Sequence, residues 1–276
     1  MASVLPTRGP NRDRSHEVKR YEDRKPYINA ATAAGIQTVF NRTRLSHQGW
    51  ESRQLAGRLD GRVAWRNDAR GSIDIFKDRR LPSPTKLDVH ILVDSSGSMS
   101  GDRICRAQDM AGTLVDAFKR IPTVRVHVYQ HYATGGGTYI FRVYEPGDSL
   151  DGLTKMLHNI AGGNADGFAL EAVGNRAASQ KRPDTKSLVI MVSDGLPSVT
   201  GVGATADILD HSTIVTQNLK RKGVDVMAVA IAGDNRAHER MYGKGSSVLF
   251  TGDWNALNRS FAAVFGKVLA SAPTHR

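Results

Sequence analysis

One short stretch of the chain carries oxygen-bearing side chains at a spacing that suits a metal ion. It reads Asp94-Ser95-Ser96-Gly97-Ser98 and places an aspartate and two serines at alternate positions. Alternate side chains of an extended stretch share one face, so the oxygens of Asp94, Ser96 and Ser98 can converge. Gly97 allows the backbone to turn sharply between them. The spacing therefore predicts three hard oxygen ligands in one loop.

Two later loops offer further carboxylates. Asp166 lies just before a predicted helix, and Asp194 follows the apolar run 187–192. The predicted metal residues are Asp94, Ser96, Ser98, Asp166 and Asp194. A ligand set of carboxylates and hydroxyls favours Mg²⁺, with Mn²⁺ or Ca²⁺ as alternatives, over zinc or copper. Simpler roles stay open, because Asp and Ser are common turn residues and Asp166 can cap the helix or hold a ligand from a second layer.

The elements that must position these loops alternate along the chain from residue 87 onward. The pattern predicts strands over 87–93, 124–129, 139–144, 187–192, 224–232 and 247–250, and helices over 103–119, 150–160, 167–179, 206–222 and 255–270. Such alternation is typical of an α/β fold with a doubly wound, mostly parallel sheet. The turn at 135–137 is short, so strands 124–129 and 139–144 should form one antiparallel edge hairpin. Ligands in such Rossmann-like sheets bind beyond the carboxyl ends of the strands.

The N-terminal third differs from the rest in charge and pattern. Residues 1–86 hold 18 Lys and Arg against 9 Asp and Glu, whereas residues 87–276 hold 20 against 18. We expect a basic, partly ordered N-terminal extension over 1–86 and one domain over 87–276. A short helix is expected over 30–40 and a short strand over 73–76. The arginines can contact a protein partner, which interleaved aspartates favour, or nucleic acid with Tyr21, Trp50 and Trp65 as stacking residues.

Several function classes are disfavoured by what the sequence lacks. Cys105 is the only cysteine, so an intrachain disulfide is impossible and a reducing cytoplasm is expected. No apolar run reaches the roughly 18 residues of a membrane span. The chain has neither a Walker-type phosphate loop nor a Gly-x-Ser-x-Gly elbow, so no catalytic centre of its own is evident. A zinc site at His127 and His131 is also disfavoured.

The three loops together resemble a known family. Asp94-x-Ser96-x-Ser98 after an apolar strand is similar to the metal-ion-dependent adhesion site of von Willebrand factor A domains, and Ser193-Asp194-Gly195 is similar to the family's third metal loop. The resemblance covers about residues 87–270. It implies a metal-dependent protein-interaction module. The middle loop departs from the family pattern, since Asp166 stands where threonine is usual.

That departure resembles the C-terminal region of the cobaltochelatase subunit CobT. The similar segments are Asp166-Gly-Phe-Ala-Leu170, Gly57-Arg-Leu-Asp60 and Ile75-Phe-Lys-Asp-Arg-Arg80. This resemblance implies a non-ATPase subunit working beside an AAA+ ATPase of the CobS or MoxR type, with a large chelatase subunit as a further partner, in ATP-dependent cobalt insertion into a corrin ring. The alternative is a stand-alone interaction or nucleic-acid-binding protein with no chelatase role.

Overall fold

The structure is a computed structural model that describes residues 2–5, 24–46, 50–67, 74–79, 86–135, 137–156, 158, 162–195, 197–198, 205–231 and 235–270. The chain divides into two compact units. The larger consists of residues 1–39 together with 86–276, and the smaller consists of residues 40–85. The expected extension over 1–86 is thus shared between the two units.

A seven-stranded sheet forms the centre of the larger unit. Its strands are β1 (Ala2–Leu5), β5 (Lys86–Asp94), β6 (Val124–Thr134), β7 (Gly137–Tyr144), β8 (Thr185–Ser193), β9 (Val224–Ile231) and β10 (Ser247–Phe250), in the order β1-β7-β6-β5-β8-β9-β10. Neighbouring strands are parallel except β6 and β7. The predicted mostly parallel sheet with an antiparallel hairpin is confirmed, and β1 extends it by one strand beyond the hairpin.

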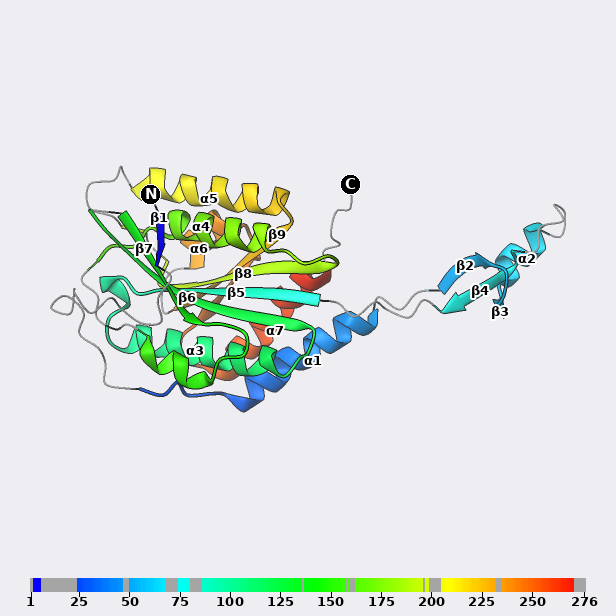
Figure 1. The fold of residues 1–276 in the computed structure, drawn as a ribbon, viewed down its shortest axis with the longest axis horizontal. Coiled ribbons are helices and arrows are strands. Elements are labelled where there is room, and N and C mark those ends of the chain that lie inside the picture. Colours follow the sequence, from blue (N-terminus) through cyan, green and yellow to red (C-terminus); the bar gives the residue numbers. More distant parts are fainter. Residues whose placement is uncertain are drawn as a thin grey trace. The chain divides into compact units, whose positions relative to one another are not determined.

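Helices cover both faces of this sheet, with α4, α5 and α6 on one face and α1, α3 and α7 on the other (Figure 1). Their bounds are α1 (Ala30–Ser46), α3 (Asp102–Lys119), α4 (Asp166–Ser179), α5 (Thr205–Arg221), α6 (Asn235–Tyr242) and α7 (Trp254–Ala270), and the short 3₁₀ helices are η3 (Gly97–Met99) and η4 (Leu150–Lys155). Among the described residues, no helix combines the length and apolarity that crossing a bilayer would require.

Burial explains why the central strands read as continuous apolar runs. Every residue of β5 from Leu87 to Asp94 is buried, because helices cover both faces of the strand. Helix α3 buries one face in its first part, with Ile104 and Ala107, and is buried on all sides from Met110 to Phe118. The sheet and its helices therefore hold the ends of β5 and β8 at fixed positions.

The segment before α1 joins the larger unit through a specific ion pair. Arg24 donates from Nη1 and Nη2 to the two carboxylate oxygens of Asp109 at 2.7 and 2.8 Å. Asn29 then caps α1 by accepting from the backbone N–H of Thr32 at 2.9 Å. At Gly35, a Cβ atom would lie 2.4 Å from Asn258 Oδ1, so glycine permits the close approach of α1 and α7.

The smaller unit contains a three-stranded antiparallel sheet in the order β2-β4-β3 and one short helix. Its elements are β2 (Trp50–Gln54), β3 (Arg58–Leu59), α2 (Gly61–Asn67) and β4 (Phe76–Arg79). Asp60 is 5% exposed and accepts from the N–H of Arg62, which caps α2. Ordered structure here was predicted only as a strand over 73–76, and the observed strand begins at Phe76.

Two other local predictions differ from the structure. The expected helix over 150–160 is the 3₁₀ helix η4, which ends at Lys155, and residues 159–161 lie outside the described part of the chain. Helix α6 was not predicted, because its eight residues are mostly polar. The predicted helix over 206–222 is confirmed as α5, which ends at Arg221, and Gly223 just beyond it adopts a φ of 74° that glycine accommodates best.

Candidate metal centre

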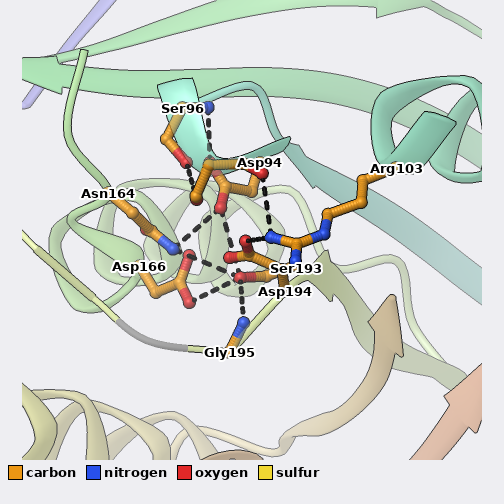
Figure 2. Close-up of polar contacts among 9 residues, drawn as sticks. Asp94, Ser96, Arg103, Asn164, Asp166, Ser193, Asp194 and Gly195 are labelled. Atoms are coloured by element: carbon orange, nitrogen blue, oxygen red, sulfur yellow. Dashed lines mark hydrogen bonds and ion pairs between the residues drawn. The ribbon is translucent and has the colours of Figure 1, made fainter. Parts of the chain in front are cut away.

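The three predicted loops meet at the carboxyl ends of β5 and β8, which are neighbouring parallel strands. Asp94 is the last residue of β5, Asp194 follows the last residue of β8, and Asp166 opens α4. Figure 2 shows the carboxylates of Asp94 and Asp166 directed at Ser193, while Arg103 reaches Asp194. The topology therefore brings together residues that span 100 positions of the chain, from Asp94 to Asp194.

The first loop is held in a compact turn by its own side chains. Asp94 Oδ1 accepts from the N–H of Ser96 at 2.8 Å, and the hydroxyls of Ser96 and Ser98 lie 3.0 Å apart. The backbone N–H of Gly97 donates to the carbonyl of Gly162 at 2.8 Å, which ties this loop to the middle one. The predicted convergence of Asp94, Ser96 and Ser98 is therefore present in the geometry.

The middle loop supplies a bridging amide as well as a carboxylate. Asn164 donates from Nδ2 to Asp94 Oδ2 at 2.8 Å and to Ser193 Oγ at 3.2 Å. Asp166 is fully buried, and its Oδ2 accepts from Ser193 Oγ at 3.2 Å and from Tyr242 Oη at 3.4 Å. These neighbours place Asp166 in the deeper part of the site, behind Asp94.

The third loop brings Asp194 to the mouth of the site. Its Oδ2 accepts from Arg103 Nη1 at 2.9 Å, and its side chain is 8% exposed. The following Gly195 has a φ of 104°, and its N–H donates to Ser193 Oγ at 3.2 Å. Ser193 thus contacts the residues of all three loops and orders them around one hydroxyl.

Burial of so many acidic groups raises the pKa of Asp94 to about 7. Removal of its carboxylate from water is the main cause, and the charge of Asp166 adds to it, whereas His131 acts in the opposite direction. Burial alone would lower the pKa of His131, but its contact with Asp166 and the charges of Asp94 and Asp166 raise it. Its Nε2 lies 3.3 Å from Asp166 Oδ1. A cation bound beside Asp94 would therefore favour its ionised form.

Sequence reasoning missed four contributors: Arg103, His131, Ser193 and Tyr242, together with the bridging role of Asn164. A signal existed for His131, because the parallel register pairs it with Asp94 across β5 and β6. No spacing rule pointed to Tyr242, which comes from α6, a helix that was not predicted. Tyr242 is fully buried, and both burial and Asp166 raise its pKa well above the usual value.

The donor set fits a hard divalent cation. Two buried oxygens at the site, Asn164 Oδ1 and Asp194 Oδ1, have no hydrogen-bond partner within the described part of the chain, and Asp166 Oδ1 has only the ion pair with His131. Buried polar atoms are normally satisfied, so unpartnered oxygens indicate room for a ligand. Among the described residues, no three His, Cys, Asp or Glu side chains form a metal cage by themselves. The hydroxyls of Ser96 and Ser98 would therefore be needed.

Comparison with solved structures shows the same fold in proteins of low identity. Manganese-loaded TRAP from Plasmodium vivax is 18% identical, with a TM-score of 0.50, and the match covers 67% of this chain and 74% of that one. Mussel byssus proximal thread matrix protein 1 is 18% identical, with a TM-score of 0.50 and coverage of 67% and 48%. A mutant PilB minor pilin from Streptococcus sanguinis is 11% identical, with a TM-score of 0.51 and coverage of 70% and 65%.

The chain spans about half the length of the mussel structure. No curated protein matches it. The model of the von Willebrand factor type A domain matches residues 88–263, which include most of β5, all three loops of the site and most of α7. With this match, the sheet order and the three converging loops, the chain belongs to the von Willebrand factor type A domain family.

Proposed function

We propose that this chain is a protein-interaction module that depends on a divalent cation, Mg²⁺ in the first instance, with Mn²⁺ or Ca²⁺ as substitutes. The observation that carries the proposal is the convergence of Asp94, Ser96 and Ser98 with Asp194, whose Oδ1 is buried and unpartnered. The manganese-loaded structure of the related TRAP domain supports it. The reducing cytoplasm remains the compartment that we propose for a chain with one cysteine.

The residues divide into those that would hold the ion and those that hold the ligands. Asp94, Ser96, Ser98 and Asp194 would hold the ion, with Ser98 exposed at the mouth, and the fully buried Asp166 would add negative charge. A bound divalent ion would offer a coordination position to a carboxylate of the partner. Asn164 and Ser193 keep the carboxylates of Asp94 and Asp166 in place through bonds of 2.8 to 3.3 Å.

The finer part of the proposal is that the partner is an AAA+ ATPase of the CobS or MoxR type and that the chain is its non-ATPase, CobT-like subunit. The support is the motif Asp166-Gly-Phe-Ala-Leu170 and the absence of a phosphate-binding loop, so ATP hydrolysis would come from another chain. Cobalt insertion into a corrin ring, with a large chelatase subunit, is the nearest named task. The resemblance to CobT rests on sequence motifs alone.

The test is recovery of partners from native lysate by the full chain in Mg²⁺, with EDTA and an Asp94→Ala variant as parallel samples. The proposal expects an AAA+ ATPase in the Mg²⁺ sample and its loss in the other two. Recovery of the same ATPase in EDTA would contradict metal dependence. Recovery of metal-dependent partners without any ATPase would overturn the finer part only.

The exposed side chains of the smaller unit support a second contact between this chain and a partner. Trp65 is 85% exposed, Leu55 71% and Leu59 53%, and Arg53 and Arg62 are exposed on the same unit. The exposed leucines beside arginines suit an acidic protein segment, because leucines do not stack on bases, whereas Trp65 suits either kind of partner. Of the stacking residues predicted for nucleic acid, Tyr21 lies outside the described residues. Trp65→Ala should weaken partner recovery, whereas salt-dependent binding of single-stranded DNA to residues 40–85 would favour nucleic acid.

A further inference from the structure

We propose that Arg103 is a built-in cation of the metal site, which competes with the divalent ion for Asp194 and thereby sets the metal affinity. This inference rests on the metal binding proposed above. It adds a residue from outside the three loops, because Arg103 lies in the first turn of α3.

The geometry places the guanidinium between two of the loops. Arg103 Nη1 donates to Asp194 Oδ2 at 2.9 Å and to the carbonyl oxygen of Ser98 at 3.0 Å. A single nitrogen therefore joins the loop after β5 to the loop after β8 (Figure 2). One of its two acceptors belongs to a proposed metal ligand, and the other belongs to the backbone of a second proposed ligand.

The charges of the site explain why a cation is held there. The side chains of Asp94 and Asp166 are fully buried and that of Asp194 is 8% exposed. Buried carboxylates are unfavourable unless a cation or hydrogen-bond donors compensate them. His131 faces Asp166 on the inner side, and Arg103 faces Asp194 at the mouth. Without metal, the chain itself thus places a basic side chain at each side of the acidic cluster.

His131 and Arg103 differ in how easily they can move away from the acidic cluster. His131 is fully buried, so it cannot move away without opening the core. The Arg103 side chain is 44% exposed, and its charged end can turn into water while its helix stays in place. A divalent ion that engages Asp194 would repel the guanidinium at this short range. The exchange of metal for an internal cation would therefore occur at Arg103.

Calorimetric titration of the full chain with Mn²⁺ tests this directly. Arg103→Gln removes the competing charge and keeps a donor for the Ser98 carbonyl, so we expect the association constant to rise about fivefold to tenfold. Arg103→Lys keeps the charge and should stay within about twofold of the native chain. Arg106→Gln is the matched control, because Arg106 lies one turn further along α3 and donates to the Thr251 carbonyl instead. It should leave Mn²⁺ binding unchanged.

Thermal unfolding gives a second measurement that does not need the partner. In EDTA, Arg103→Gln should lower the Tm, because Asp194 loses its cation, whereas at saturating Mn²⁺ the variant and the native chain should have the same Tm. Metal would thus raise the Tm more in the variant.

Each outcome decides between the claims. Native binding of Mn²⁺ with unchanged or weaker binding by Arg103→Gln would overturn the inference alone, since Arg103 would then merely position Asp194. Binding by Arg103→Gln but not by the native chain would support it in its strongest form. Absence of binding by both chains at millimolar Mn²⁺ would overturn the proposed metal site and this inference together.

Discussion

Two buried polar clusters lie on the same two strands, β5 and β6, and they are built in opposite ways. In register, Asp94 pairs with His131 at the carboxyl end of β5, and four residues earlier His90 pairs with His127. Four residues along a strand return to the same face, so both clusters lie on one side of the sheet. Their histidines nonetheless differ, because the pKa of His131 is raised while the pKa values of His90 and His127 are lowered.

The difference comes from the acid beside each histidine. At the His90 end, Asp88 is already paired with Arg125 at 3.0 Å and with Arg182 at 2.6 Å, so little negative charge is left for the histidines. Burial therefore dominates and lowers the pKa of His90 to about 3, with His127 adding to the effect. The two rings stack 4.8 Å apart as neutral groups.

At the Asp94 end, acids outnumber the internal cations and oxygens stay unpartnered. Asp194 Oδ1 is buried without a hydrogen bond among the described residues, and Asp166 Oδ1 has an ion pair with His131 at 3.3 Å. The acid at one end of the strand is thus paired with two arginines, whereas the acids at the other end leave a carboxylate oxygen without a partner. This contrast leads us to propose a structural role for the acid at the first end and a binding role for the acids at the second.

The largest effect is expected when one acid at each end of β5 is substituted, which tests the two roles separately. Asp94→Asn should lower Mn²⁺ affinity at least a hundredfold, or about 2.8 kcal/mol, since a charged ligand is lost. Asp88→Asn should leave Mn²⁺ affinity intact and instead destabilise the fold by about 1–3 kcal/mol, because Arg125 and Arg182 lose their anion. Calorimetry and urea unfolding in EDTA measure the two quantities. Equal loss of metal binding in both variants would break the comparison.

A smaller loss of metal affinity is expected for Asp166→Thr, which installs the residue usual in the family. The carboxylate lies behind the ligands, so removing it should weaken Mn²⁺ binding about tenfold to a hundredfold, or ~1.4 to 2.8 kcal/mol. His131 would also lose the anion that raises its pKa, and an NMR titration should show that pKa falling. Unchanged Mn²⁺ affinity with a lower Tm in EDTA would show that Asp166 serves only the fold.

Acid should act on the two ends with opposite sign. The pKa of His90 falls from 6.5 to about 3 on folding, so its contribution to stability is present above pH 6.5 and is lost as pH falls toward 3. The pKa of Asp94 rises from 3.8 to about 7, so its burial destabilises the metal-free fold above pH 7 and does so less as pH falls. Each effect changes the free energy of unfolding by at most about 1.4 kcal/mol per pH unit.

Two substitutions should separate these opposite pH dependences of stability when unfolding is measured in EDTA between pH 7 and 5.5. Relative to the native chain, His90→Phe should lose less stability on acidification, while His127 and His158 keep their lowered pKa values. Asp94→Asn should lose more stability than the native chain, because the opposing Asp94 effect is removed. Urea unfolding at several pH values measures both slopes, and parallel slopes in the two variants would contradict the assignment. Mn²⁺ affinity of the His90→Phe chain should still weaken below pH 7, because the metal needs ionised Asp94.

The fold was largely predictable because its strands and helices have distinct periods. The apolar run 187–192 predicted a strand and residues 103–119 predicted a helix, and the structure confirms both as β8 and α3. Prediction failed where tertiary contacts decide: η4 is held by contacts with β7 and α3, and the strand β1 forms only by pairing with β7. Residues 1–86 lacked periodicity, so their division at residue 39 could not be foreseen.

The loops of the site were predictable for a related reason, since parallel topology brings strand ends to one edge. The residues that support these loops were harder to predict. His131 could be inferred only after the register of β5 and β6 was known, and Arg103 only after the start of α3 was placed. Tyr242 reaches Asp166 from 76 residues away, a distance over which local patterns carry no information.

The smallest effect is expected at His127, and it tests whether the two ends of the strands are independent. His127→Phe keeps an aromatic ring to stack on His90 but removes a group whose positive charge lowers the pKa of His90. The pKa of His90 should therefore rise toward its usual value, and less stability should be lost on acidification. At pH 7.5 both histidines are neutral in the native chain, so the free energy of unfolding should change by no more than about 0.5 kcal/mol. Mn²⁺ affinity should stay the same, because His127 lies four residues away from His131 along β6. A change of more than about threefold in Mn²⁺ affinity would mean that β6 transmits changes between the two clusters. The pH dependence of stability at the His90 cluster would then be coupled to metal binding at the Asp94 cluster.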